Sequence, residues 1–434
     1  MEELLTMKRF LSIGAQLVGV LLSLCFRPVI AAEATKFDFE NLSALIKKAD
    51  IRSVEQLLPR LPKEFQKNYV LMKDSVSNQG ATPENPRVIV FSNDAKLILA
   101  FTGDSEKAKD YSNLEIIQFR EKTNSFEFRK VEFDKDKVAN ISEKNPERCL
   151  KCHQKDPRPN WENYRFWPGA YGEKDDSLSP TEEKQLTSFF VDALKHPRYQ
   201  HLTNLKESFQ MELDYTNVKR TKGHHNIEFG RRVAQLNFRR IARLIRDLPN
   251  YEKIKYAVIG MLRCARWYSG DSVLKFFPER DDIKKIFEKY KSTSDQSPYG
   301  YNQGEFLLSL INEIGGASTS GWSMNFRFFQ SGGFYKDKSS YRRDNDSLRT
   351  PNAHTRELSA ILAEQDPELE KFLDIDERAY GGIKVKVADA SEKSCKNLEE
   401  LSVKAIENLK SSQRKDSSSE ESNLGFATHQ KQAI

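Results

Sequence analysis

The strongest constraint on the fold of this 434-residue chain is that its strand-like and helix-like segments are segregated along the sequence. Between Tyr69 and Phe133, five short segments are rich in β-branched and aromatic residues, and turn-forming sequences such as Asn78-Gln79-Gly80 separate them. The later segments have the apolar spacing of helices. This order predicts an α+β fold: a small N-terminal antiparallel sheet followed by a mainly α-helical region. The five predicted strands are 69–72, 87–91, 96–101, 114–119 and 126–133.

The last of these segments indicates how the predicted sheet meets solvent. Phe126 and Phe128 alternate with charged residues, and Val131 and Phe133 continue the alternation only after a slip of one position. We therefore expect a slip in this strand and one wet face on the sheet. Nothing in the five strands indicates catalytic chemistry.

The motif that carries chemistry is Cys149-Leu150-Lys151-Cys152-His153, which has the spacing of a c-type haem attachment site. On one helical turn, both sulfurs lie on one side, where they can bond one porphyrin edge, and His153 follows closely enough to ligate the iron. Its other ring nitrogen, Nδ1, then needs an acceptor such as a backbone carbonyl. The composition of the chain predicts only about 0.001 chance occurrences of this pattern.

Three other interpretations of the cysteine pair remain open. A structural zinc site would need a fourth ligand, and the other cysteines, Cys25, Cys264 and Cys395, stand alone. A thioredoxin-like dithiol should follow a strand, whereas this pair follows a polar run. A plain disulfide between the two motif cysteines is the third alternative.

The N-terminus has the pattern of a secretory signal peptide. Lys8 and Arg9 precede an apolar run, and small residues allow cleavage just before Ala32 or Glu33. The alternative is an uncleaved membrane anchor, but Arg27 and Pro28 interrupt the apolar run. We therefore expect a periplasmic or secreted protein with no transmembrane segment after cleavage. Bacterial c-type haem attachment takes place outside the cytoplasm, as knowledge of the c-type cytochromes implies, so the two signals agree.

Export and charge bear on the remaining cysteines and on partners. An oxidising compartment permits a disulfide between Cys264 and Cys395, and two separate buried thiols are the alternative. The formal charge of +6 favours an acidic partner surface over nucleic acid. We expect a redox partner protein and no nucleic acid.

Beyond the motif, three prolines and two glycines predict an ordered loop that contains several aromatic residues. These aromatics would pack on a haem face or form a local core against the sheet, and Arg158 or Arg165 would pair with a haem propionate. The combined pattern is Cys149-x-x-Cys152-His153 with Asp156-Pro157-Arg158-Pro159-x-Trp161-x-x-Tyr164-x-x-Trp167-Pro168-Gly169-x-Tyr171-Gly172. It resembles a group of exported bacterial proteins that have a strand-rich region upstream and a single c-type haem motif. The resemblance implies one covalent haem c and a cytochrome-like protein, and it implies no known reaction.

Several helices are predicted after the loop. Ser179-Pro180-Thr181-Glu182 is a capping box that opens a helix reaching Lys195, and a long helix should run from about Ile227 to Asp247. The long helix carries an arginine face, which would either dock an acidic redox partner or be solvated. That face consists of Arg231, Arg232, Arg239, Arg243 and Arg246. Further helices are predicted at 250–268, 278–291, 303–314, 354–364, 367–373 and 396–409.

The predicted regions are a signal peptide (1–32), a helical lead-in (33–66), the β meander (67–135), a mainly helical cytochrome c-like region with the haem motif (136–409) and a disordered tail (410–434). The site residues are Cys149, Cys152 and His153, with His153 as the metal ligand. His224, His225 and Met211 are the leading candidates for the sixth iron ligand. Electron transfer is the first functional hypothesis. A haem enzyme or redox or gas sensor with an open distal site is the second, and a non-haem module with a disulfide is the third.

Overall fold

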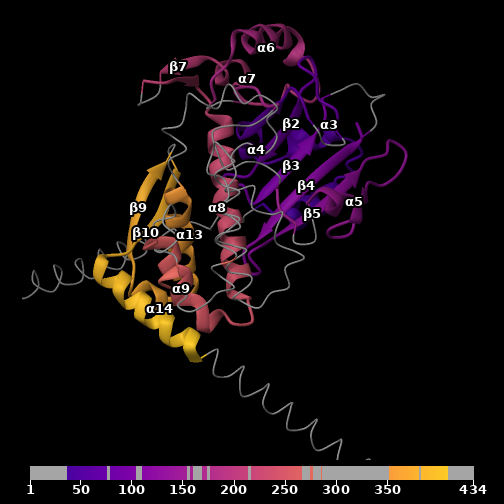
Figure 1. Cartoon of the computed structure of the whole chain (residues 1–434). Helices are drawn as coiled ribbons and strands as arrows, with labels where there is room; N and C mark the ends of the chain where they lie inside the picture. The colour runs from indigo at the N-terminus through magenta and orange to yellow at the C-terminus, as the bar shows by residue number, and fades with distance from the viewer. Residues whose placement is uncertain are drawn as a thin grey trace, which may run out of the picture. The chain divides into compact units, whose positions relative to one another are not determined.

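The fold is taken from a computed structural model of the chain, shown in Figure 1. It describes residues 37–75, 79–103, 110–153, 157–159, 169–173, 176–213, 217–265, 274–276, 285, 351–380 and 383–408. The chain divides into two units, 1–38 and 39–434, and every element named below belongs to the second. The predicted signal peptide, the predicted helix 303–314 and the predicted tail lie outside the described residues, as does segment 278–291 apart from residue 285.

The predicted helical lead-in consists of four short helical pieces. The first, α2 (Phe39–Lys48), buries Phe39, Leu42 and Ile46 on one face, as the apolar spacing requires. The next pieces are α3 (Val54–Leu57), the 3-10 helix η1 (Leu58–Arg60) and α4 (Lys63–Lys67). The Ser53 side chain caps α3 by accepting a hydrogen bond from the Gln56 backbone amide, and Pro62 directly precedes α4.

The predicted antiparallel sheet is present, and its strands run in sequence order from β1 to β6. The five predicted strands are confirmed with ends that differ by at most one residue. The sequence expectation missed β6, which adds a short edge to β5. The strands are β1 (Tyr69–Met72), β2 (Arg87–Phe91), β3 (Leu97–Phe101), β4 (Asn113–Arg120), β5 (Ser125–Glu132) and β6 (Asn140–Ile141).

The predicted slip in the fifth strand is wrong, because β4 and β5 pair without interruption from Asn113↔Glu132 to Arg120↔Ser125. Phe126 and Phe128 therefore share one face of the sheet with Lys130, while Val131 lies on the opposite face. The change from aromatic to charged residues along β5 is a change in the environment of that face and not a change of register.

The predicted wet face is also absent from β5. Val131 is fully buried, and Glu127, on the same face, is 8% exposed. The Glu127 carboxylate accepts a hydrogen bond from Arg120 Nε at 3.0 Å and forms an ion pair with Lys144 at 2.6 Å. These partners compensate the cost of removing a carboxylate from water, and they also hold the pKa of Glu127 below its ordinary value against the opposing effect of burial.

The long helix α8 (His225–Arg246) packs along the sheet, as Figure 1 shows. Its side chains Phe229, Val233 and Leu236 form one core cluster with residues from β1 to β5. The Phe229 ring lies 4.6 Å from the Phe91 ring of β2. We call the side of the sheet that bears this cluster the α8 face. Its apolar strand residues are Val70, Met72, Ile89, Phe91, Ile98, Ala100, Ile117, Phe119, Phe126 and Phe128.

Among the described residues, four elements lie between the last strand of the sheet and α8 in the sequence. They are α5 (Glu147–His153), α6 (Pro180–Ala193), α7 (Leu205–Ser208) and the hairpin of β7 (Met211–Leu213) and β8 (Lys219–Thr221). The predicted capping box of α6 is confirmed: the Ser179 side chain accepts from the Glu182 amide, and the Glu182 carboxylate accepts from the Ser179 amide at 2.8 Å. The Glu182 carboxylate also pairs with Lys73 Nζ at 2.9 Å, which ties α6 to the segment after β1.

The second half of α8 belongs to a different core cluster, which contains Phe238, Ile241 and Ile245. This cluster also draws on α9 (Tyr251–Arg263), α13 (Pro351–Gln365), α14 (Pro367–Glu370) and the residues just after α14. The hairpin of β9 (Asp374–Tyr380) and β10 (Ile383–Asp389) pairs over seven positions. This hairpin corrects the expectation of helices alone in this part. The alternation of apolar residues with lysines from Ile383 to Val387, directly after Gly381-Gly382, signalled it in the sequence.

Cys264 and Cys395 form a disulfide with a Cα–Cα distance of 5.6 Å. Sequence alone left a disulfide and two separate thiols as alternatives, and the structure decides for the disulfide. The bond joins the C-terminal end of α9 to the helical residues 392–408, whose Leu398 and Ile406 belong to the same core cluster. In the described part of the chain, no helix combines the length and the apolar character needed to cross a bilayer.

The packing of α8 on the sheet gives a testable expectation for stability. Phe229 is fully buried, so Phe229→Ala removes most of a ring from the contact with Phe91. We expect the free energy of unfolding in urea to fall by about 3–5 kcal/mol. Val191→Ala on α6, where the side chain is 68% exposed, is the control and should change stability by less than about 0.5 kcal/mol. Equal effects of the two substitutions would contradict the packing described here.

Candidate functional site

The motif cysteines and histidine lie on the short helix α5. The chain reaches α5 along the edge of β5, where Asn145 binds the Phe128 backbone twice. The Asn145 amide donates to the Phe128 carbonyl at 2.8 Å, and the Asn145 Oδ1 atom accepts from the Phe128 amide at 2.8 Å. Asn145 has φ of 54°, a left-handed conformation that asparagine tolerates well. It therefore turns the chain from the sheet edge into Pro146 and the first turn of α5.

Cys149 and Cys152 are three positions apart on α5, as the motif predicts for two sulfurs on one side of a helix. Cys149 is half-buried and packs against the core cluster of the α8 face. The Cys152 side chain lies outside the described residues. Because Cys264 and Cys395 are bonded to each other, neither can serve as the further ligand that the zinc interpretation needs.

His153 ends α5 and is held on two sides. Its ring lies 4.2 Å from the Phe128 ring of β5. Its Nδ1 atom is 2.7 Å from the Arg158 carbonyl oxygen. A carbonyl oxygen can only accept, so Nδ1 carries the proton, and Nε2 is the ring nitrogen with a lone pair. This is the arrangement expected for a proximal haem ligand, in which a backbone carbonyl fixes the tautomer.

The electrostatics around His153 favour a neutral ring. Burial lowers the pKa of His153 below its ordinary value. The hydrogen bond to the Arg158 carbonyl and the nearby Glu115 carboxylate oppose this shift, while the Arg158 and Arg87 guanidinium groups reinforce it. Only a neutral imidazole has a lone pair available for a metal ion, so the shift acts in the direction that ligation needs.

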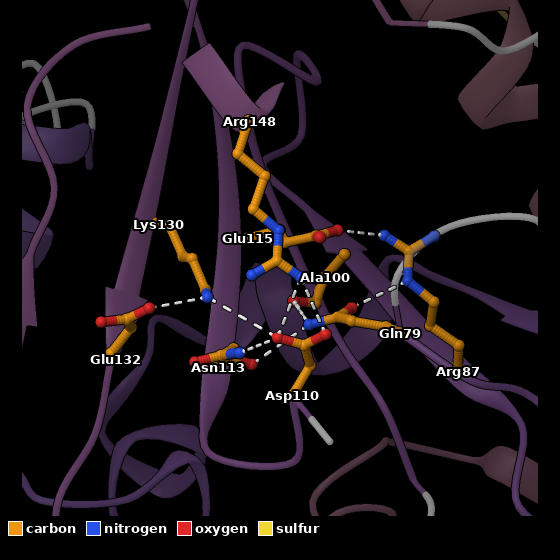
Figure 2. Close-up of polar contacts among 9 residues, drawn as sticks. All are labelled: Gln79, Arg87, Ala100, Asp110, Asn113, Glu115, Lys130, Glu132 and Arg148. Carbon is orange, nitrogen blue, oxygen red and sulfur yellow. Dashed lines mark hydrogen bonds and ion pairs between the residues drawn. The ribbon is translucent and has the colours of Figure 1, made fainter. Parts of the chain in front are cut away.

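The α8 face is polar at the end where α5 lies. The paired positions of β2, β4 and β5 place Arg87, Glu115 and Lys130 on this face, beyond its apolar rows. Figure 2 shows the contacts of Arg87, which donates hydrogen bonds to Gln79 at 2.8 Å and to Glu115 at 2.7 Å. The side chain of Gln79, which is fully buried, donates to the backbone carbonyls of Ala100 and Asn113 at 3.3 and 3.2 Å. The sequence alone does not reveal this polar group, because its contacts come from separate strands and loops.

The loop after the motif returns to the opposite edge of the sheet. Gly169 accepts hydrogen bonds from the Lys73 and Asp74 amides at 2.7 and 3.1 Å, and Ala170 bridges to Met72 of β1. Tyr171 is buried, and its hydroxyl donates to the Pro83 carbonyl at 3.0 Å. For Tyr171, the structure therefore decides in favour of a local core. Trp161, Tyr164 and Trp167 lie outside the described residues, as does Arg165.

Arg158, one of the two predicted propionate partners, is 4% exposed. Its Nη1 atom donates to the Pro159 carbonyl at 3.1 Å, within the same short segment that accepts from His153. The Arg158 guanidinium thus lies close to the motif, as expected, and takes part in contacts within the chain.

The predicted sixth ligands lie elsewhere. His225 is the first residue of α8, and its ring lies 4.4 Å from Tyr69 of β1 and 5.1 Å from Phe209. His153 instead contacts β5, four strands away, which corresponds to roughly 19 Å across a sheet. His224 is the N-cap of α8, and Met211 on β7 pairs with Thr221 just before that helix. The described structure therefore brings none of these three residues beside His153.

The arginine face of α8 is engaged within the chain. Arg231 pairs with Glu357, Arg232 with Glu228 at 2.6 Å and Arg239 with Glu364 at 3.1 Å. Arg243 pairs with Asp247 at 3.3 Å, and Arg246 donates to Gln365 at 3.5 Å. Three of these contacts reach α13. The expected docking face for an acidic partner is thus largely a seam between two helices of the same chain.

Comparison with protein-family models, with curated proteins and with solved structures gives no match. Within the described residues, no three His, Cys, Asp or Glu side chains are grouped so as to hold a metal ion. The candidate site therefore rests on the motif itself and on the contacts that surround α5.

The position of His225 gives a prediction for the pH dependence of stability. Burial lowers the pKa of His225 from 6.5 to about 3, and the neighbouring His224 adds to this shift. The unfolded chain binds this proton at a higher pH than the folded protein, so stability falls as pH decreases from 6.5 towards 3. One such group contributes a slope of up to about 1.4 kcal/mol per pH unit.

Carboxylates also titrate in this range, so the test compares the wild type with His225→Phe, which keeps a ring between Tyr69 and Phe209. We expect the unfolding free energy of the variant, measured by denaturant titration at several pH values, to depend less steeply on pH. Identical slopes for the two proteins would refute a buried, neutral His225.

Proposed function

We propose that this protein carries one haem c attached covalently to Cys149 and Cys152, with His153 as the proximal iron ligand, and that it transfers electrons outside the cytoplasm. The observation that carries the proposal is the hydrogen bond from His153 Nδ1 to the Arg158 carbonyl oxygen, at 2.7 Å. It orients the imidazole and leaves Nε2 with the lone pair for a metal ion, on the same helix as the two motif cysteines.

The residues of α5 fit this group by their chemistry. Two cysteines three positions apart supply thiols for two thioether bonds, and the adjacent histidine supplies a neutral nitrogen ligand. When bound, haem iron supplies a one-electron redox centre. The chain's own residues hold the ring of His153 against Phe128 and fix its tautomer through Arg158. The polar group around Glu115 and Arg87 supplies charge close to that ring.

The disulfide between Cys264 and Cys395 supports the exported location, because such bonds persist in oxidising compartments. It is independent of the N-terminal signal, since it depends on residues far from the first 32. A periplasmic or secreted location is also where bacterial haem attachment of this type takes place. The partner that this function implies is a redox protein, and the pairing of the α8 arginines within the chain moves the expected contact surface away from that helix.

Covalent haem attachment is the first test of the proposal. We expect the protein, expressed with a c-type maturation system, to keep its haem on a denaturing gel, as shown by haem staining and by a pyridine haemochrome spectrum. Cys149→Ala with Cys152→Ala should abolish the stain, because both thioether bonds are lost. The matched control is Cys264→Ala with Cys395→Ala, which also removes two cysteines and should keep the stain. A wild-type protein without covalent haem would overturn the proposal.

Iron ligation by His153 is tested separately. We expect His153→Gln to change the visible spectrum of the haem protein, because the amide replaces the ligand nitrogen. His201→Gln, a change at another half-buried histidine, should leave the spectrum as in the wild type. If His153→Gln gave a wild-type spectrum in both oxidation states, His153 would not be the proximal ligand.

A further inference from the structure

The helix that carries the motif is too short to be stable by itself. α5 has seven residues, and isolated helices shorter than about 12–15 residues are marginal in water. Its position must therefore come from contacts with the rest of the chain. Several of these contacts use the motif side chains: Cys149 packs on the α8 face, and His153 contacts Phe128 and Arg158.

One strong contact of α5 uses no motif side chain. Arg148, which directly precedes Cys149, donates from Nη2 to both carboxylate oxygens of Asp110, at 3.0 Å to Oδ2 and 3.3 Å to Oδ1. Figure 2 shows Arg148 reaching down from α5 to this carboxylate. The Asp110 side chain is only 5% exposed, whereas that of Arg148 is 45% exposed.

The Asp110 carboxylate is itself fixed in the sheet. Asn113 of β4 donates to it through its side-chain amide, and the Asn113 backbone amide donates to the Asp110 carbonyl at 3.1 Å. Lys130 of β5 lies 3.6 Å from Asp110 Oδ1 and 2.7 Å from the Glu132 carboxylate. A buried carboxylate with several fixed donors is a better anchor than a surface ion pair, which contributes only about 0–1 kcal/mol.

From this geometry we propose that Asp110 is a positioning residue for the haem site: through Arg148, it fixes α5 on the sheet and so sets where Cys149 and His153 are presented. This proposal rests on the proposed function, because it concerns the haem site, but the contact between Arg148 and Asp110 does not require haem. The strand residues around Asp110 are also connected to His153. Lys130 is the cross-strand neighbour of Glu115, and the Glu115 carboxylate interacts electrostatically with the His153 ring.

The first experiment uses the haem-free protein. Amide hydrogen exchange of residues 147–153 is compared among the wild type, Asp110→Asn and Arg148→Gln. We expect both variants to exchange about fivefold faster in α5, with the exchange of β3 unchanged. Glu147→Gln is the matched control, because it removes an exposed charge from the same helix, where Glu147 is only 3.8 Å from Lys151. It should change little.

The double variant Asp110→Asn with Arg148→Gln tests the coupling. If the two residues act through one contact, the second substitution adds little to the first. Additive effects, or wild-type exchange in both single variants, would overturn the proposal. Faster exchange in β3 as well as in α5 would mean that Asp110 supports the whole sheet, which also contradicts a role confined to α5.

A measurement on the haem protein separates positioning from a simple charge effect. Asp110→Asn removes a negative charge and Arg148→Gln removes a positive one, so a pure charge effect would shift the reduction potential in opposite directions. Loss of position should shift it in the same direction in both variants and lower the fraction of protein with covalent haem. Opposite shifts would overturn the proposal. A wild type without haem would refute the proposed function alone, since hydrogen exchange still decides the role of Asp110.

Discussion

The unbroken pairing of β4 with β5 is the constraint on which the rest of the site depends. Eight residue pairs fix which side chains of β5 share the α8 face. Phe126 and Phe128 then lie in the apolar part of that face, and Lys130 lies at its polar end. A shift of one residue would exchange the two faces and place Glu127 or Arg129 where Phe128 now meets His153. The apolar part receives α8, and the motif helix lies where the two parts meet, with His153 on Phe128 and Arg148 on the network of Lys130 and Asp110.

Whether a feature of this fold could be predicted from the sequence depends on how far apart along the chain its interacting residues lie. The strands were predictable to within a residue because β-branched runs and turn residues are local signals. The capping box of α6 is equally local. By contrast, alternation along β5 gives a period of two, but it cannot tell whether a charged residue faces water or a buried partner. Glu127 and Lys130 both look exposed in the sequence, and each has fixed partners in the structure.

The arginines of α8 show the same limit. Their spacing along one helix is visible in the sequence, whereas their partners on α13 are more than 110 residues away. A charged helix face is therefore an incomplete description until the neighbouring helix is known. The same holds for Cys264 and Cys395, which are 131 positions apart and become partners only through the packing of α9 with residues 392–408. In contrast, the acceptor for His153 is five residues away, at Arg158, so the expected backbone acceptor is available within the local sequence.

The helix α8 contributes to two separate hydrophobic cores, and only one of them includes the sheet that carries the motif helix. Its first half, with Phe229 and Val233, completes the core of the sheet that carries α5. Its second half, with Phe238 and Ile241, completes the core that includes the β10 strand and the disulfide-linked segment. A 22-residue helix is about 33 Å long, so its two halves lie against different neighbours. The sequence of the motif supplies the atoms that would bind the proposed haem, whereas the contacts of His153 with Phe128 and of Arg148 with Asp110 fix the motif helix on the sheet. The five motif residues alone therefore define the chemistry of the candidate site but only part of its structure.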